Sequence, residues 1–303
     1  MNFGEIMYLN NGSAQVALVL SVAMLVGSFN TAAQMQNATA PEPVAPTKVS
    51  LLMESQLNSA INKWSFAWGW NREVYSKSDI HFSGTNHDFT LSDVKAKDKQ
   101  KELTLGTLFT TFLNPGNLTI PQTNMRIAYQ LSKDTAVAFN LDHMKYVVSD
   151  GQTVRSSGSY TNSSGTTTLG ATKTLNADFM HYEHTDGLNI ISLEYEKQYS
   201  LEIPRVNMPA RAFSLVGLGF VMPKSNITMT MIEQTRNDQF HIAGYSAAVG
   251  GGVEADFLKR YFVRGAYKFG YVNLPDVKTS ARGDKASQSF TYNELLMLIG
   301  VRF

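Results

Sequence analysis

The sequence predicts an all-β fold, a transmembrane antiparallel up-and-down β-barrel of about ten strands. The first observation behind this prediction is the C-terminal segment 295–303, where apolar residues occupy every second position up to a final aromatic residue. Strands of a membrane barrel need this period of two, because their side chains point alternately to lipid and to the lumen. The apolar set is Leu295, Met297, Ile299, Val301 and Phe303, opposite Glu294, Gly300 and Arg302. Leu296 and Leu298 share the second side and blur the alternation.

The second observation is an aromatic stripe near residue 64. Trp64, Phe66, Trp68 and Trp70 fall on one face of a strand, and they include all three tryptophans of the chain. The residues between them are small or polar. In a membrane barrel such a stripe faces lipid, whereas in a soluble sandwich it packs against a second sheet.

The third observation is a polar average composition. The chain of 303 residues is 43% hydrophobic, and its mean hydropathy is -0.16. This is too polar for a helical membrane protein, but it suits a barrel with a polar interior or a soluble β-protein. With 26 basic and 25 acidic residues, the net charge of +1 gives no indication of a nucleic-acid partner. The lack of cysteine excludes disulfides and thiolate metal sites.

Residues 1–33 resemble a signal peptide. The apolar run 16–26 is too short to cross a bilayer as a helix, and Ala32 and Ala33 supply small residues at a cleavage position. The first basic residue is Lys48, with Glu5 where positive charge is expected, so a retained anchor helix stays an alternative. Three prolines predict a linker at the start of 34–62, followed by a short helix. The barrel is then expected to cover 63–303.

Alternating segments recur along that barrel region. Short links at 132–135 and 258–260 contrast with long polar links at 77–118, 149–174, 223–240 and 274–286. Short turns on one rim and long loops on the other are typical of outer-membrane barrels. The segments 78–95 and 226–234 are ambiguous, which leaves eight to twelve strands. The predicted strands after the aromatic stripe are 124–131, 136–142, 177–184, 188–198, 212–222, 241–257, 261–273 and 287–303.

Charged residues of both signs fall on the predicted lumen side of these strands. Inside a narrow barrel such charges need to pair. At about ten strands, side chains fill most of the interior, so we expect a plugged lumen and not a wide pore. The charged set is Glu73, Arg126, Asp142, Glu254, Arg264, Lys268, Glu294 and Arg302.

Several segments make the region from Trp64 to Phe303 similar to uncharacterised small outer-membrane β-barrel proteins of Gram-negative bacteria. The resemblance implies the barrel fold and a location in the cell outer membrane, but it implies no particular activity. The segments are 67–72 (AWGWNR), 78–82 (SDIHF), 88–91 (DFTL), 142–147 (DHMKYV) and 183–189 (EHTDGLN).

The catalytic candidates are His184, Asp186 and Glu194. The segment is loosely similar to the His-x-Ser and downstream Glu of outer-membrane lipid A deacylases, in which a His base activates a hydroxyl. Here Asp186 stands in place of the serine, and the nearest hydroxyls are Thr185 and Ser192. The alternative is a plain hairpin turn at 184–187. A position of His184 within hydrogen-bond reach of Glu194 or Ser192 favours the enzyme.

The expected function is a structural, adhesive or surface-interaction role, without an assigned enzymatic activity. A lipid A or phospholipid acyl hydrolase and a narrow porin for small solutes are the alternatives. The expected partners are outer-membrane lipids and lipopolysaccharide, with the barrel assembly machinery recognising the C-terminal strand. We expect a monomer, with no cofactor and no metal ion. His81 and His87 flank a turn near Asp88, which is a weak pattern for a cation.

Overall fold

The computed structural model describes residues 63–99, 101–114, 117, 121–202, 208–237, 239–258 and 260–303. The predicted signal peptide at 1–33 and the linker and helix at 34–62 lie outside the described residues. Within the described part of the chain, no helix is both long and apolar enough to span a membrane.

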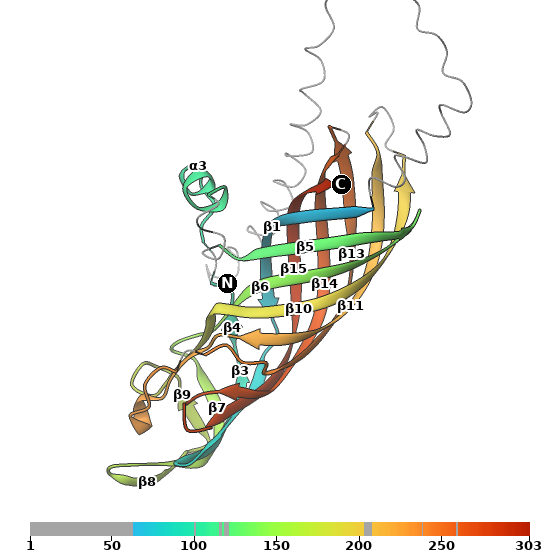
Figure 1. Cartoon of the computed structure of the whole chain (residues 1–303). Coiled ribbons are helices and arrows are strands. Elements are labelled where there is room, and N and C mark those ends of the chain that lie inside the picture. The colour runs from blue at the N-terminus through green and yellow to red at the C-terminus, as the bar shows by residue number, and fades with distance from the viewer. Residues whose placement is uncertain are drawn as a thin grey trace, which may run out of the picture.

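Eight antiparallel strands close into a ring, since β1 pairs with β5 on one side and with β15 on the other (Figure 1). Each strand pairs with the next ring strand along the chain, so the predicted up-and-down barrel is confirmed. It closes with eight strands, at the lower end of the predicted range. The ring comprises β1 (Trp64–Tyr75), β5 (Thr123–Ser132), β6 (Thr135–Val148), β10 (His181–Leu201), β11 (Ala210–Pro223), β13 (Gly244–Phe257), β14 (Tyr261–Lys278) and β15 (Lys285–Arg302).

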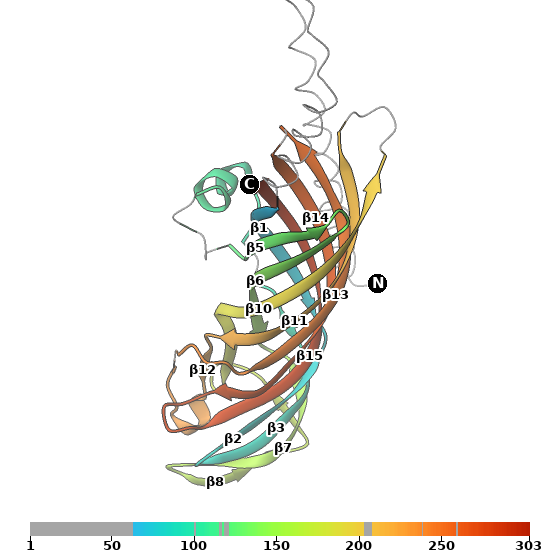
Figure 2. The ribbon, with the colours of Figure 1, turned by 45° about the vertical axis from the view of Figure 1, so that its right-hand side comes forward.

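A second group of strands prolongs this sheet beyond one rim of the barrel, in the order β15-β2-β3-β7-β8. We call β2 (Ser78–Gly84), β3 (His87–Val94), β7 (Thr153–Asn162) and β8 (Gly165–Thr168) the extension. Both views show it at the end of the barrel opposite the C-terminus (Figures 1 and 2). The stretches 77–118 and 149–174, expected as loops, therefore contain strands.

Short elements complete the fold. Strand β4 pairs with β6, β9 with β7, and β12 with β10. The helical segments α3 and η2 follow each other directly in the chain. The bounds are β4 (Ala96–Lys97), α3 (Leu105–Thr107), η2 (Leu108–Phe112), β9 (Thr172–Thr174), β12 (Asn226–Thr228) and η4 (Thr230–Ile232).

The barrel wall is apolar outside and polar inside, as the period of two requires. Leu193 and Leu218 leave 61% and 68% of their surface exposed on the outer face. On β1 the aromatic stripe faces outward, while Asn71 and Glu73 are buried inside. Leu298, which blurs the pattern of β15, packs inside the barrel against Phe262. A wall of this kind fits a lipid environment around an ionic interior.

The two rims differ as predicted. The β5–β6 and β13–β14 links, at 133–134 and 258–260, are short. At the opposite rim the chain forms the extension, and an apolar core fills the barrel mouth there, including Phe82, Phe89 and Tyr182. Since outer-membrane barrels carry short turns on the periplasmic side, the extension faces the cell exterior.

Candidate functional site

A cluster of buried charged side chains fills the membrane-level lumen, and we call it the ionic core. Every predicted lumen charge except Arg302 is nearly or fully buried. Neighbouring contacts from Asn71 on β1 and Arg211 on β11 bring all eight ring strands into this network. The ionic core comprises Arg126, Asp142, Glu194, Glu196, Glu254, Arg264, Lys268 and Glu294.

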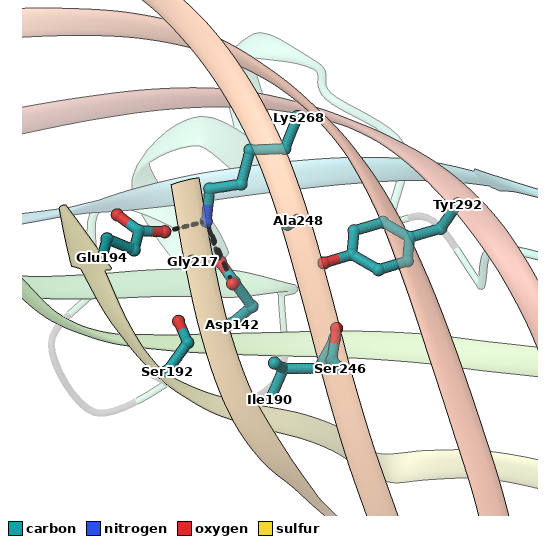
Figure 3. A pocket seen from close by; sticks show the side chains of 9 residues that line it. All are labelled: Asp142, Ile190, Ser192, Glu194, Gly217, Ser246, Ala248, Lys268 and Tyr292. Atoms are coloured by element: carbon teal, nitrogen blue, oxygen red, sulfur yellow. Dashed lines mark hydrogen bonds and ion pairs between the residues drawn. The ribbon is translucent and has the colours of Figure 1, made fainter. Parts of the chain in front are cut away.

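Lys268 is the central cation of the ionic core. Its Nζ lies 2.9 Å from Glu194 Oε1, 3.1 Å from Asp142 Oδ2 and 3.6 Å from Glu294 Oε2. Figure 3 shows the side chain reaching from β14 to the carboxylates of Glu194 and Asp142. These contacts tie β14 to β6, β10 and β15 across the lumen. A buried ammonium group needs such partners, because burial removes its hydration.

Two arginines form a second set of pairs toward the short-turn rim. Arg126 Nη2 lies 2.8 Å from Glu196 Oε2, and Arg264 Nη1 lies 3.0 Å from Glu254 Oε2. Arg264 also pairs with Glu196, and its guanidinium carbon lies 3.4 Å from the centre of the Phe213 ring. The predicted plugging of the lumen by paired charges is confirmed. The arrangement places the planar guanidinium group of Arg264 between carboxylates and an aromatic ring.

A small cavity lies beside Lys268, lined by Ser192, Ser246 and Tyr292 among others (Figure 3). Its volume is about 10 Å³. That is about the space of a single water molecule. The cavity therefore has no room for an acyl chain or a sugar, and its polar lining suits an ordered water.

The structure places His184 away from the ionic core, in the apolar core at the exterior end. Its side chain is fully buried, with Nδ1 2.7 Å from Ser225 Oγ and Nε2 3.3 Å from Gln288 Nε2. The rings of Tyr146 and Tyr182 pack against it. The predicted turn at 184–187 is wrong: these residues form a β-bulge within the single strand β10, where Gly187 has a φ of +129°.

The other two catalytic candidates have different partners. Asp186 is partly exposed and pairs with Arg236 at 2.5 Å and Lys224 at 3.4 Å. Glu194 lies ten residues beyond His184 along β10 and belongs to the ionic core. His184 contacts neither Glu194 nor Ser192, so the structure does not bring the three candidates together. The hydroxyl that His184 contacts belongs to Ser225, which is buried and therefore inaccessible to lipid.

Several residues around His184 were missed by sequence reasoning. Ser225, Gln288 and Tyr182 form a buried hydrogen-bonded network, in which Gln288 Nε2 donates to the Tyr182 hydroxyl at 3.0 Å. Ser78 and Tyr146 continue it at 3.1 Å. Ser225 is 41 residues from His184 in the chain. No local spacing signals such a contact.

The two histidines flanking the first hairpin of the extension take different positions. His81 is half-exposed, with Nε2 3.1 Å from Asp88 Oδ1. His87 is buried, and burial lowers its pKa despite the nearby carboxylates of Asp284 and Asp88. Within the described ranges, no group of three or more histidine or carboxylate side chains is placed to hold a metal ion.

The closed eight-stranded sheet, apolar outside and ionic inside, makes this chain an integral β-barrel protein of the outer membrane. Its extension reaches the cell exterior. No protein-family description matches the sequence. No curated protein matches it either.

Solved structures similar to this chain are themselves outer-membrane proteins. Neisserial surface protein A has 10% identity and a TM-score of 0.34, covering 79% of this chain and 96% of that one. The outer membrane protease OmpT from Escherichia coli has 9% identity and a TM-score of 0.36, covering 80% and 97%. The attachment invasion locus protein Ail of Yersinia pestis has 10% identity and a TM-score of 0.31, covering 80% and 99%. Likenesses this distant carry no conclusion about activity.

Proposed function

We propose that this barrel is a surface-interaction protein that holds the extension outside the cell and binds a partner through the free edge of β8. The observation that carries the proposal is the position of β8. It ends the sheet order, and all four of its residues are exposed. Unpaired strand edges are templates for strand addition by another chain.

The chemistry of the extension supports this role. The segment 156–172 consists mostly of Ser, Thr and Gly, so its exposed surface is rich in hydroxyl groups and poor in charge. On β8 the direction of the backbone groups is fixed by Leu169, whose N–H donates inward to Gly158 O at 2.9 Å. Since directions alternate along a strand, the N–H of Thr168 points away from β7 and is available to a partner strand.

The filled lumen argues against the narrow porin. Charge pairs from seven of the ring strands, with a hydrogen bond from Asn71 on β1, cross the interior. The cavity beside Lys268 accommodates about one water molecule. The separation of His184 from Glu194 likewise gives the acyl hydrolase no support. A filled barrel that carries an exposed sheet is suited to holding that sheet in position for a binding partner.

The test is attachment of cells that display the full chain. Non-adherent Gram-negative cells expressing it should attach to host-cell or abiotic surfaces, or to each other, more than cells expressing a barrel with a short Gly-Ser link in place of 153–174. Thr168→Pro removes the outward N–H and should reduce attachment to that background. Thr168→Val keeps the N–H and should leave attachment intact. Equal attachment by the full chain and the shortened barrel would contradict the proposal.

A further inference from the structure

The segment that contains α3 and η2 lies against the outer wall of the barrel, at a place where lipid is expected. Both views show α3 beside β1 and β5, outside the ring (Figures 1 and 2). The ring of Phe112 packs on Trp70 of the aromatic stripe at 5.9 Å between centroids. Arg72 fixes the segment further, because it donates to Lys101 O at 3.1 Å.

The far side of this helical segment is apolar and uncovered. Leu105, Phe109 and Leu113 recur at every fourth residue and are 82%, 67% and 42% exposed. Residues four apart form one stripe on a helix. In water, such a stripe costs free energy, whereas in acyl chains it is favourable. We call these three residues the apolar stripe.

Several polar groups of the segment are hydrogen-bonded within it. Residues 103–125 contain no charged residue and no histidine. Thr104 and Thr107 form a reciprocal cap at the start of α3, and the Thr110 hydroxyl donates to Gly106 O at 2.8 Å. The Asn117 side-chain amide donates to Thr110 O at 3.0 Å. Internal hydrogen bonding of this kind is what a hydrocarbon environment demands.

A row of lysines precedes the apolar stripe. Lys95, Lys97, Lys99 and Lys101 are all exposed and stand at every second position. Lys97 belongs to β4, which pairs with β6 toward the exterior end of the wall. The positive charges therefore lie where headgroups are expected when the apolar stripe lies among acyl chains. Basic residues next to an apolar helix face are typical of binding to anionic lipid.

We propose that this segment is an outer-leaflet lipid-binding element. The apolar stripe enters the acyl chains, and the three lysines nearest to it in the chain, Lys97, Lys99 and Lys101, bind the phosphate groups of anionic lipid headgroups. The occupant is bilayer lipid. This inference concerns a surface other than the β8 edge, and its test is independent of cell attachment.

Depth in the bilayer is the first test, and the cysteine-free sequence makes single labels possible. Phe109→Cys, Leu218→Cys and Thr166→Cys are labelled with an environment-sensitive dye and reconstituted in vesicles containing acyl-chain doxyl phosphatidylcholine. Leu218 is the reference for the lipid-facing wall, and Thr166 on β8 is the reference for water. The label at Phe109 should be quenched as strongly as that at Leu218. Quenching no greater than at Thr166 overturns the proposal.

Headgroup preference is the second test, read at the Phe109 label. Doxyl phosphatidylglycerol should quench it about twofold or more better than doxyl phosphatidylcholine at equal mole fraction, because each nearby lysine attracts anionic lipid. The Lys97→Gln, Lys99→Gln, Lys101→Gln variant should bring this ratio to about one. The matched control is Lys77→Gln, Lys278→Gln, Lys285→Gln, which changes exposed lysines elsewhere at the exterior end. A ratio of one in the unchanged chain, or equal loss in both variants, overturns headgroup binding.

Discussion

The ring of Tyr292 covers the Cα of Gly270, directly opposite it in the β14–β15 ladder. A Cβ at position 270 would overlap the Tyr292 ring. Phe262 covers Gly300 in the same way, eight residues nearer the short-turn rim along β14. In each pair the aromatic ring occupies the space that a side chain at the glycine would otherwise take. Each pair therefore packs β14 closely against β15 on the lumen side.

Gly270→Ala is expected to destabilise the barrel by about 1–3 kcal/mol, because the added methyl group displaces the Tyr292 ring in a filled interior. Urea titration followed by the gel mobility of unheated samples measures this. Gly170→Ala is the control, since its Cβ would meet nothing closer than 3.9 Å. In a Tyr292→Ala background the cost of Gly270→Ala should shrink. Additive effects would contradict the direct contact.

Lys268→Met is expected to cost about 3–5 kcal/mol, because it leaves the carboxylates of Asp142, Glu194 and Glu294 without their shared cation. The same urea titration measures it. Lys197→Met is the matched control: it breaks an exposed pair with Asp134 and should have little effect. Equal losses in the two variants would mean that the ionic core is not the stabilising feature.

The extension should loosen in mild acid through His87. Burial lowers the pKa of His87 in the folded protein below its ordinary value of 6.5. The unfolded state therefore takes up the proton more readily, and stability present above pH 6.5 is lost as the pH falls below it. Hydrogen exchange of β2 and β3 at pH 7.5 and 5.5, corrected for intrinsic rates, measures this.

His87→Gln should remove most of the pH dependence of that exchange. His81→Gln, which alters the half-exposed histidine of the same hairpin, should leave it in place. If both variants keep the response of the unchanged chain, a different group is responsible. Asp284 and Asp88 are the carboxylates whose charges act on His87.

The purified protein should give no steady conductance in planar bilayers. Charge pairs such as Arg126–Glu196 and Arg264–Glu254 occupy the lumen at membrane level. An ion would have to displace these contacts, at a cost of several kcal/mol for each desolvated charge. Reproducible open steps at neutral pH would contradict the filled lumen.

The barrel could be predicted from the sequence because lipid and lumen impose a period of two on every ring strand. The strand number could not, since Ile80 and Phe82 in β2 alternate just as ring residues do, although β2 lies outside the ring and these residues pack in the apolar core at the exterior end. The Asp186-Gly187 pair has the composition of a hairpin turn, yet it forms a bulge. Local sequence does not distinguish these outcomes.

The candidate site was harder to predict than the fold. The lumen charges were predictable, because polar residues on the inner face of a narrow barrel have to pair. The partner of His184 was not predictable. Ser225 directly precedes β12, and the pairing of β12 with β10 brings it to His184. That contact depends on the whole sheet.

The extension is joined to the barrel through residues 285–288 of β15, which pair with 80–83 of β2. A force applied at the tip is thus carried from strand to strand through backbone ladders into the wall. Because this connection is a hydrogen-bonded sheet and not a flexible linker, a partner bound to the extension would pull directly on the membrane-anchored barrel.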